Sequence, residues 1–235
     1  MKYKVEKYIE KHQLIEKGST VLVALSGGAD SVALLLVLYN LGYRCEAIHC
    51  NFHLRGDESN RDEQFTRELC ERLGVTLYIA HFDTRAYAQE KSISIEMAAR
   101  ELRYQWVAQL AEQQECQAIA VAHHQNDQAE TLLLNLKRGT GLRGLAGMRP
   151  KSNGWNRDMD NQHTKSHTPI IRPLLCTTRD YILHYLRDIR HIQWVEDSTN
   201  SDTSFQRNAI RQQLATYTKA EIQHMAQTAS RVQGY

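Results

Sequence analysis

Short, continuous runs of apolar residues alternate along the first part of the chain with longer segments of helical periodicity. The apolar runs cover residues 20–25, 45–50, 75–82 and 118–122. Strands with apolar residues at consecutive positions are typical of a parallel sheet that is buried on both faces. We therefore predict an α/β fold with a doubly wound, Rossmann-like parallel sheet and helices on both of its faces.

Helices are predicted between these strands, where apolar residues recur with helical spacing. They cover residues 30–41, 58–73, 93–113 and 126–137, and a further helix at 2–17 precedes the first strand and ends at Gly18. The alternation stops after Gly139. Beyond it we expect short strands near 145–149 and 169–172 around a mobile polar insertion at 151–168, then helices at 178–188 and 219–235 with a polar loop at 194–208.

The composition fits one packed α/β domain and limits the kinds of partner and cellular environment that we expect. The chain has 235 residues, of which 42% are hydrophobic, and its formal net charge of +2 is only mildly basic. A nucleic-acid partner would therefore need a local basic patch. The five cysteines include no C-x-x-C pair, which indicates reduced thiols and a cytoplasmic protein. No apolar run approaches about 20 residues, so we expect no membrane span and no membrane partner.

The turn after the first apolar run carries the strongest chemical signal. Its sequence, SGGADS at residues 26–31, places two glycines between a predicted strand and a predicted helix. Glycine lets backbone N–H groups approach phosphate oxygens at the positive end of a helix, and the hydroxyls of Ser26 and Ser31 can add donors. Asp30 would repel a phosphate unless a cation lay between them, which points to Mg²⁺. The alternative is a tight turn in which Asp30 only caps the helix.

Charged side chains follow the other predicted strands at the same sheet edge. The stretch HCNFHLRGDES follows the second strand, and the helix at 93–113 carries Arg100 and Arg103 on one face. Asp127 and Glu130 lie at the start of the helix after the fourth strand. Their spacing of three lets both carboxylates point into one pocket.

Simpler interpretations of these residues stay open at this point. Asp127 could cap its own helix, with Asn126 an equal candidate, and Arg103 could lie in solvent. A zinc site is a further alternative, although H-x-x-x-H on an irregular loop is a poor ligand spacing and no cysteine completes a tetrahedral set. The histidines concerned are His49, His53, His123 and His124.

The motif SGGxDS after the first strand resembles the loop signature of the N-type ATP-pyrophosphatase (PP-loop) superfamily, whose fold is adenine nucleotide alpha-hydrolase-like. Further motifs narrow the resemblance. They are H-x-N-x-x-L-R-G at 49–56, H-H-x-x-D-Q-x-E-T at 123–131, R-G-T-G-L-x-G-L at 138–145, E-D-x-[ST]-N at 196–200 and R-N-x-I-R at 207–211. In this combination, from Thr20 to Arg211, the chain resembles the bacterial tRNA(Ile)-lysidine synthases.

The resemblance implies ATP and Mg²⁺ as cofactors and assigns roles to the matching residues. The ATP-binding residues would be Ser26, Gly27, Gly28, Ala29, Asp30, Ser31, Asn51 and His123. The catalytic residues would be Asp30, Arg100, Asp127 and Glu130, with Asp30 holding Mg²⁺ and Arg100 neutralising charge on the α-phosphate. Asp127 and Glu130 would bind lysine, and which of them accepts its proton stays open. The residues that would contact tRNA are Arg55, Arg138, Arg207 and Arg211.

The implied activity is the ATP-dependent ligation of L-lysine to the wobble cytidine of an isoleucine tRNA with a CAU anticodon. The reaction would form a carbon–nitrogen bond through an adenylated cytidine, leaving lysidine, AMP and pyrophosphate. One alternative is another PP-loop enzyme, either thiolase-like or a small-molecule amidotransferase partner. The thiolases use cysteines, often as C-x-x-C, which this chain lacks. A second alternative is a domain that binds ATP without chemistry.

The resemblance also divides the chain. Residues 1–19 would form an N-terminal helix, residues 20–215 the PP-loop catalytic domain, and residues 216–235 the start of a linker helix. Lysidine synthases generally continue into C-terminal domains that contact tRNA. We therefore expect either a truncated chain or an unusually short member, and a homodimer is left open.

Overall fold

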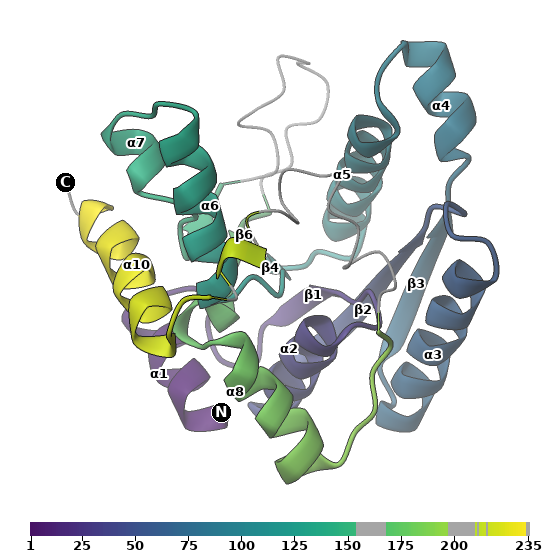
Figure 1. The fold of residues 1–235 in the computed structure, drawn as a ribbon. Helices are drawn as coiled ribbons and strands as arrows, with labels where there is room; N and C mark the ends of the chain where they lie inside the picture. The colour runs from purple at the N-terminus through teal and green to yellow at the C-terminus, as the bar shows by residue number, and fades with distance from the viewer. Residues whose placement is uncertain (154–167, 197–209, 211, 215, 234–235) are drawn as a thin grey trace.

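The fold is built on a mostly parallel sheet in the computed structural model, which describes residues 1–153, 168–196, 210, 212–214 and 216–233. Six strands lie in the order β3-β2-β1-β4-β6-β5 within this part of the chain (Figure 1). All neighbours are parallel except β5, which is antiparallel to β6. The strands are β1 (Thr20–Ala24), β2 (Arg44–Asn51), β3 (Thr76–His81), β4 (Ala118–Ala120), β5 (Lys151–Ser152) and β6 (Ile170–Ile171). The predicted fold class is confirmed.

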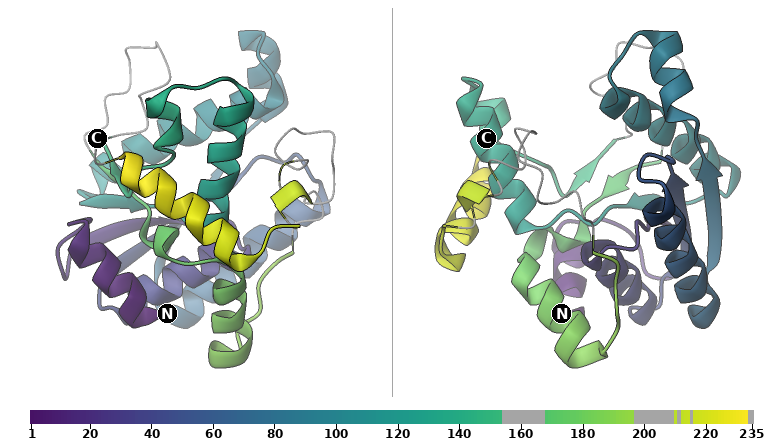
Figure 2. Two further views of the ribbon diagram at one scale, coloured as in Figure 1. Left: turned by 60° about the vertical axis from the view of Figure 1, so that its left-hand side comes forward. Right: turned by 45° about the vertical axis from the view of Figure 1, so that its right-hand side comes forward.

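Helices connect the strands and cover both faces of the sheet (Figures 1 and 2). Those before β4 are α1 (Lys2–Lys11), α2 (Ala29–Asn40), α3 (Asp57–Leu73), α4 (Thr84–Lys91) and α5 (Ile95–Gln113). Those after β4 are α6 (Gln125–Lys137), α7 (Leu142–Leu145), the 3₁₀ helix η1 (Pro173–Cys176), α8 (Arg179–His184) with its π-helical continuation η2 (Tyr185–Arg190), and α10 (Lys219–Val232).

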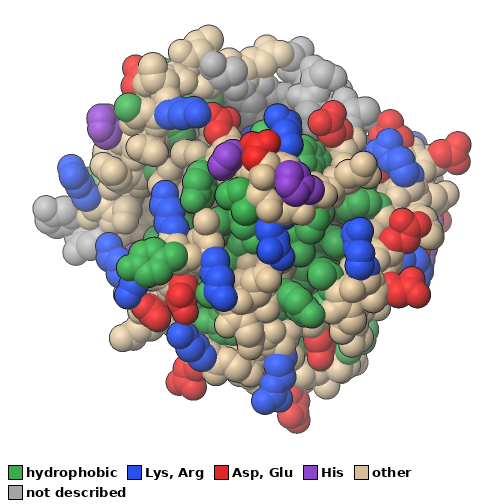
Figure 3. All heavy atoms as spheres, turned by 90° about the horizontal axis from the view of Figure 1, so that it is seen from below, with side chains coloured by type: hydrophobic (Ala, Val, Ile, Leu, Met, Phe, Trp, Pro, Cys, Tyr) green, Lys and Arg blue, Asp and Glu red, His purple; other side chains and the backbone are tan. Residues whose placement is uncertain are grey.

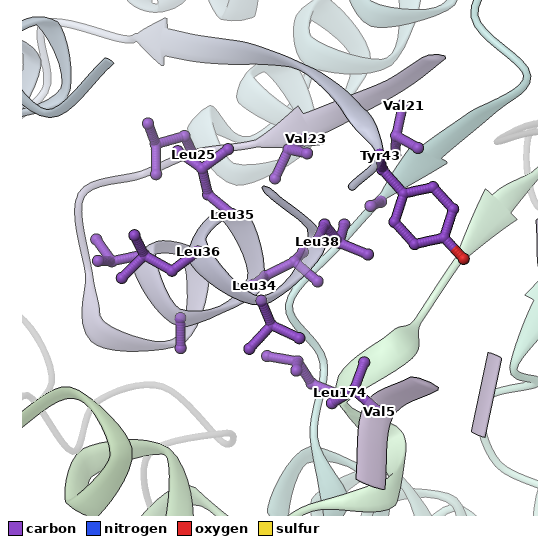
Figure 4. Packing of buried hydrophobic residues seen from close by; sticks show 14 of the residues in the cluster. Val5, Val21, Val23, Leu25, Leu34, Leu35, Leu36, Leu38, Tyr43 and Leu174 are labelled. Atoms are coloured by element: carbon purple, nitrogen blue, oxygen red, sulfur yellow. The ribbon is translucent and has the colours of Figure 1, made fainter. Parts of the chain in front are cut away.

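The core has two layers because successive residues of a strand point to opposite faces of the sheet. On one face, Val21 and Val23 of β1 join the apolar cluster that contains nearly all of α2 (Figure 4). On the other face, Leu22 packs in a second cluster with Val107 of α5. Helix α2 is apolar nearly all round and is buried at every position from Ala29 to Leu38 except Asp30, as expected for a helix inside a large core.

Two helices before β4 differ from the prediction: α1 is shorter than expected, and α4 was not predicted. The first helix was predicted to end at Gly18, but α1 ends at Lys11, and Gln13 has a positive φ of 46°. The turn at Gln13 lets Leu14 fold back into the core, where it is 1% exposed. The segment before α5 also contains α4, which was not predicted. Asp83 caps α4 and Ser94 caps α5, so local capping separates two helices where one was expected.

The segment after Gly139 differs more from the prediction. Residues 142–145 form α7, which was not predicted, and the strand expected near 145–149 lies at 151–152 as β5. The predicted strand at 169–172 and helices at 178–188 and 219–235 correspond to β6, to α8 with η2, and to α10. Most of the predicted insertion, residues 154–167, lies outside the described residues.

The packing of α2 predicts the effect of a core truncation. Leu35 is 0% exposed and faces β1 (Figure 4), so Leu35→Ala is expected to lower the free energy of unfolding by about 2–5 kcal/mol. Urea unfolding followed by circular dichroism measures this. The control Tyr39→Ala changes a 42% exposed residue of the same helix and is expected to change stability by less. Equal losses in both variants would contradict the packing described.

Candidate active site

The turn between β1 and α2 needs glycine for its backbone conformation. Gly27 has a φ of +90°, and a Cβ there would lie 3.4 Å from Phe65 and 3.5 Å from Val195. Gly28 follows as the N-cap of α2 in an extended conformation. The carbonyl of Gly27 accepts a hydrogen bond from the backbone N–H of Val195 at 2.9 Å. This turn therefore places its backbone at the positive end of a long buried helix, which favours anions.

Two serine hydroxyls hold the turn in shape. The Oγ of Ser31 donates to the carbonyl of Gly28 at 2.9 Å and accepts from the N–H of Ser26 at 3.2 Å. The N–H of Gly28 lies 3.4 Å from the Oγ of Ser26. The last two contacts are long for hydrogen bonds and correspondingly weak. A phosphate oxygen could replace them without disturbing the backbone of the turn.

Asp30, in the first turn of α2, lies next to two basic side chains. Its Oδ2 lies 3.1 Å from Nη1 of Arg179 and 3.5 Å from Nε2 of His124. Arg179 begins α8, and its backbone N–H donates to Oδ1 of Asn126 at 3.0 Å. Segments that follow β1, β4 and β6 thus converge on one carboxylate.

His124 is the N-cap of α6 and connects Asp30 to Asp127. The carboxylate of Asp127 accepts from the backbone N–H of His124 at 2.9 Å, and its Oδ2 lies 3.2 Å from Nδ1 of the imidazole. Burial opposes protonation, but the charges of Asp127 and Asp30 outweigh it and raise the pKa of His124. A protonated imidazole there pairs with both carboxylates. The capping alternative for Asp127 is met in part, because its carboxylate accepts from the backbone N–H of His124, the N-cap residue of α6.

Glu130 lies one turn further along α6 and is only 3% exposed. The structure thus brings Asp30, His124 and Asp127 into contact and puts Glu130 on the same helix as Asp127. His123, expected near the nucleotide, is partly buried between β4 and α6. Sequence reasoning missed His124 and Arg179 as members of this group. The spacing of three between His124 and Asp127 could have indicated a contact at the start of this helix, whereas nothing local marks Arg179.

Side chains at the end of β2 and in the segment after it form contacts with α3. Asn51 is 2% exposed, and its Nδ2 donates to Oε2 of Glu63 at 2.9 Å. Arg55 pairs with Asp62 at 2.6 Å. The expected roles of Asn51 with ATP and of Arg55 with tRNA stay predictions, because ligand binding would require both side chains to share or exchange these partners.

The remaining predicted cations lie at the surface. Arg100 is exposed and stacks over Tyr104 at 4.9 Å, and Arg103 is exposed over the ring of Phe52 at 5.6 Å. Arg138 is the exposed C-cap of α6. Arg207 and Arg211, expected to contact tRNA, lie outside the described residues. On the face seen from below, Lys and Arg side chains alternate with acidic and apolar ones and do not gather into one basic patch (Figure 3).

The cysteines are poorly suited to thiolate chemistry. Burial raises the pKa of Cys45 and of Cys50 to about 12. Burial likewise raises the pKa of the other three thiols to about 11. A thiol that holds its proton is a weak nucleophile and a poor metal ligand. The other cysteines are Cys70, Cys116 and Cys176.

The side chains around Asp30 fit a magnesium ion that takes one carboxylate from the protein and most of its other oxygens from a bound phosphate and water. Within the described part of the chain, no group of three or more His, Cys, Asp or Glu side chains is arranged to hold a metal. Mg²⁺ generally uses one or two protein carboxylates and completes its shell with water and phosphate oxygens. Asp30 at the phosphate-favouring turn meets that requirement, with Arg179 as its competitor for Oδ2.

No helix in the described ranges is both long enough and apolar enough to cross a bilayer.

Comparison with known proteins supports this interpretation of the turn. Residues 1–218 match the family model described as the PP-loop domain. The tRNA(Ile)-lysidine synthase of Bacteroides thetaiotaomicron is 53% identical over 211 residues, covering 90% of this chain and 46% of the relative. Proteins of the same name from Parabacteroides distasonis and Chlorobaculum tepidum are 51% and 38% identical, with 90% and 93% of this chain covered. This chain corresponds to 44% and 63% of their lengths, so it spans only part of each of these relatives.

Solved structures of other proteins have a similar fold. The U34-tRNA thiolase NcsA from Methanococcus maripaludis superposes with a TM-score of 0.75 at 19% identity, covering 100% of this chain and 78% of that one. NMN synthetase from Francisella tularensis gives 0.53 at 14% identity, covering 98% and 92%. At these identities the likeness concerns the fold alone. The family match over residues 1–218, together with the glycine turn after β1, shows that the chain belongs to the PP-loop domain family.

Proposed function

We propose that the chain ligates L-lysine to the wobble cytidine of an isoleucine tRNA with a CAU anticodon, at the expense of ATP. The observation that carries the proposal is the link through His124, which lies 3.5 Å from Asp30 and 3.2 Å from Asp127. It joins an anion-favouring turn to the carboxylates of α6 at one sheet edge. A reaction that activates a substrate with ATP and then adds an amine needs both parts side by side. The names of the relatives support the choice of tRNA and of lysidine as product.

In the first step, the carbonyl oxygen of the cytosine would attack the α-phosphorus of ATP, and pyrophosphate would leave. The backbone at Gly27 and Gly28, with the hydroxyls of Ser26 and Ser31, would bind the departing pyrophosphate. Arg100 would reach the α-phosphate from α5 and neutralise its developing charge. Bound Mg²⁺ would supply additional neutralisation of the phosphates, with Asp30 as its protein ligand.

In the second step, the ε-amine of lysine would attack the activated ring carbon, and AMP would leave. The ε-ammonium group of lysine has a pKa near 10.4, so the attacking nitrogen must first lose a proton. Asp127 and Glu130 would bind the ammonium groups, and one of them would accept that proton. His124 orients the carboxylate of Asp127 from the other side, which leaves its second oxygen available for the substrate.

The division of the chain belongs to the same proposal: an N-terminal helix at 1–19, a catalytic unit at 20–215, and the start of a linker at 216–235. Among the described residues, Arg55 and Arg138 are the proposed tRNA contacts. The relatives' additional length would supply further contacts with tRNA.

The direct test is incubation with isoleucine tRNA, ATP, Mg²⁺ and labelled lysine, with the label scored in the RNA. The expected result is incorporation that requires all four components. Pyrophosphate exchange that proceeds without tRNA would favour a small-molecule enzyme of the same fold. ATP binding without pyrophosphate release would favour a non-catalytic domain.

Asp30→Ala is expected to reduce pyrophosphate release at least about a hundredfold, because the proposed protein ligand of Mg²⁺, which neutralises the phosphates, is lost. Release is measured with saturating tRNA and ATP. The control is Asp180→Ala, which removes an exposed carboxylate in the first turn of α8 that pairs with Lys219. Unchanged release in Asp30→Ala, with a melting temperature like that of the control, would contradict the assignment.

Glu130→Gln is expected to raise the KM for lysine about tenfold or more, since a charge-assisted contact to an ammonium group is lost. Pyrophosphate release in the first step should change little. Glu112→Gln on α5, where the side chain is exposed, is the matched control. An unchanged KM for lysine would remove Glu130 from the amine site.

A further inference from the structure

Arg172, directly after β6, is a partly buried cation that has no anionic partner among the residues that the structure describes. Its Nη1 donates to the carbonyl of Arg149 at 2.9 Å and to Oγ of Ser152 at 3.1 Å. Its Nε is shielded from solvent and has no hydrogen-bond partner within the described residues. No carboxylate in that part of the chain forms an ion pair with it. Shielded guanidinium groups are normally paired, so this one needs an explanation.

The surroundings of Arg172 are neutral rather than negative. Burial lowers the pKa of Arg172, and the groups that act in the opposite direction are Tyr104 and Tyr8. Phenols are uncharged near pH 7 and do not neutralise a guanidinium. The position is nevertheless fixed, because the backbone N–H of Arg172 donates to Pro150 at 2.9 Å. Within the described part of the chain, Arg172 is thus an oriented positive charge whose Nε donates to no acceptor.

Arg172 lies at the same edge of the sheet as the acidic helix. β6 pairs with β4 in parallel, and β4 leads into His124 and α6 (Figure 1). Neighbouring strands are about 4.8 Å apart. Hydrogen bonds also connect α6 with Arg172. Gln128 of α6 binds the backbone of Met148 at 2.8 and 3.2 Å, and the carbonyl of the next residue, Arg149, accepts from Arg172.

We propose that Arg172 forms an anion subsite that binds the carboxylate of the amino-acid substrate. This inference rests on the proposed function. Free lysine has two ammonium groups and one carboxylate at neutral pH, and Asp127 and Glu130 match only the ammonium groups. The guanidinium of Arg172, directly after the neighbouring strand β6, supplies a positive charge for the carboxylate. Its planar shape suits a carboxylate, which can accept two parallel hydrogen bonds from it. ATP is the other possible source of an anion, but its proposed phosphate turn follows β1, which is separated from β6 by β4.

The test compares L-lysine with cadaverine, which is lysine without its carboxylate, in transfer to isoleucine tRNA by this chain. Wild type is expected to prefer lysine in kcat/KM by about tenfold or more. Arg172→Gln should lose that preference: kcat/KM for lysine falls about tenfold or more, while the value for cadaverine and the KM for ATP change less than about twofold. Arg172→Lys should fall between, because it keeps the charge without the fork.

Arg149→Gln is the matched control, since the contact from Arg149 to Arg172 uses the backbone carbonyl. It should keep the preference for lysine. Equal losses for lysine and cadaverine in Arg172→Gln would overturn the subsite and indicate a structural role. A raised KM for ATP would overturn it in favour of a phosphate contact, and wild type that uses both amines equally would exclude carboxylate recognition. Failure of wild type to transfer lysine at all would instead reject the proposed function, and the subsite with it.

Discussion

The parallel pairing of β1 with β4 is the constraint on which the site depends. Their register matches Val21 with Ala118 and Val23 with Ala120, so the chain leaves both strands at the same edge. Parallel neighbours cannot be joined by a tight turn, and the connection here runs through β2, β3 and four helices. Asp30 and Asp127, far apart in sequence, therefore meet on one imidazole. The large core around α2 stabilises the pairing that brings them together.

Charge balance explains how this edge can fold without a ligand. Asp30 and Asp127 lie close enough to share His124, and two unpaired carboxylates at that separation would repel. The raised pKa of His124 and the guanidinium of Arg179 supply the compensating charges. The proposed function has a defined consequence here: a Mg²⁺ ion held by Asp30 would compete with Arg179 for the same oxygen. The contact that stabilises the ligand-free site is one that binding would rearrange.

Much of the fold was predictable because its signals are local. Apolar runs gave the four strands β1 to β4 within about two residues, and glycine with Asp30 marked the turn. The errors occur where tertiary packing decides. Leu14 folds into the core and ends α1 early. Residues 142–145 form α7 against α6, where no helix was predicted. The contacts of His124 and Arg179 with Asp30 join elements far apart in sequence, so no local pattern predicts them. The lack of a carboxylate beside Arg172 among the described residues likewise depends on tertiary packing.

Helix α6 shows why the C-terminal segment matters to the chemistry. One side of α6 carries Asp127 toward Asp30, whereas Ala129 and Leu134 belong to a separate apolar cluster with Leu214 and Ile222. Ile222 lies on α10, which begins with its own capping box at Thr218. The last described helix therefore does not lie apart from the PP-loop unit. It covers the helix that presents the carboxylates, so the position of those carboxylates depends on residues well beyond the family's motifs.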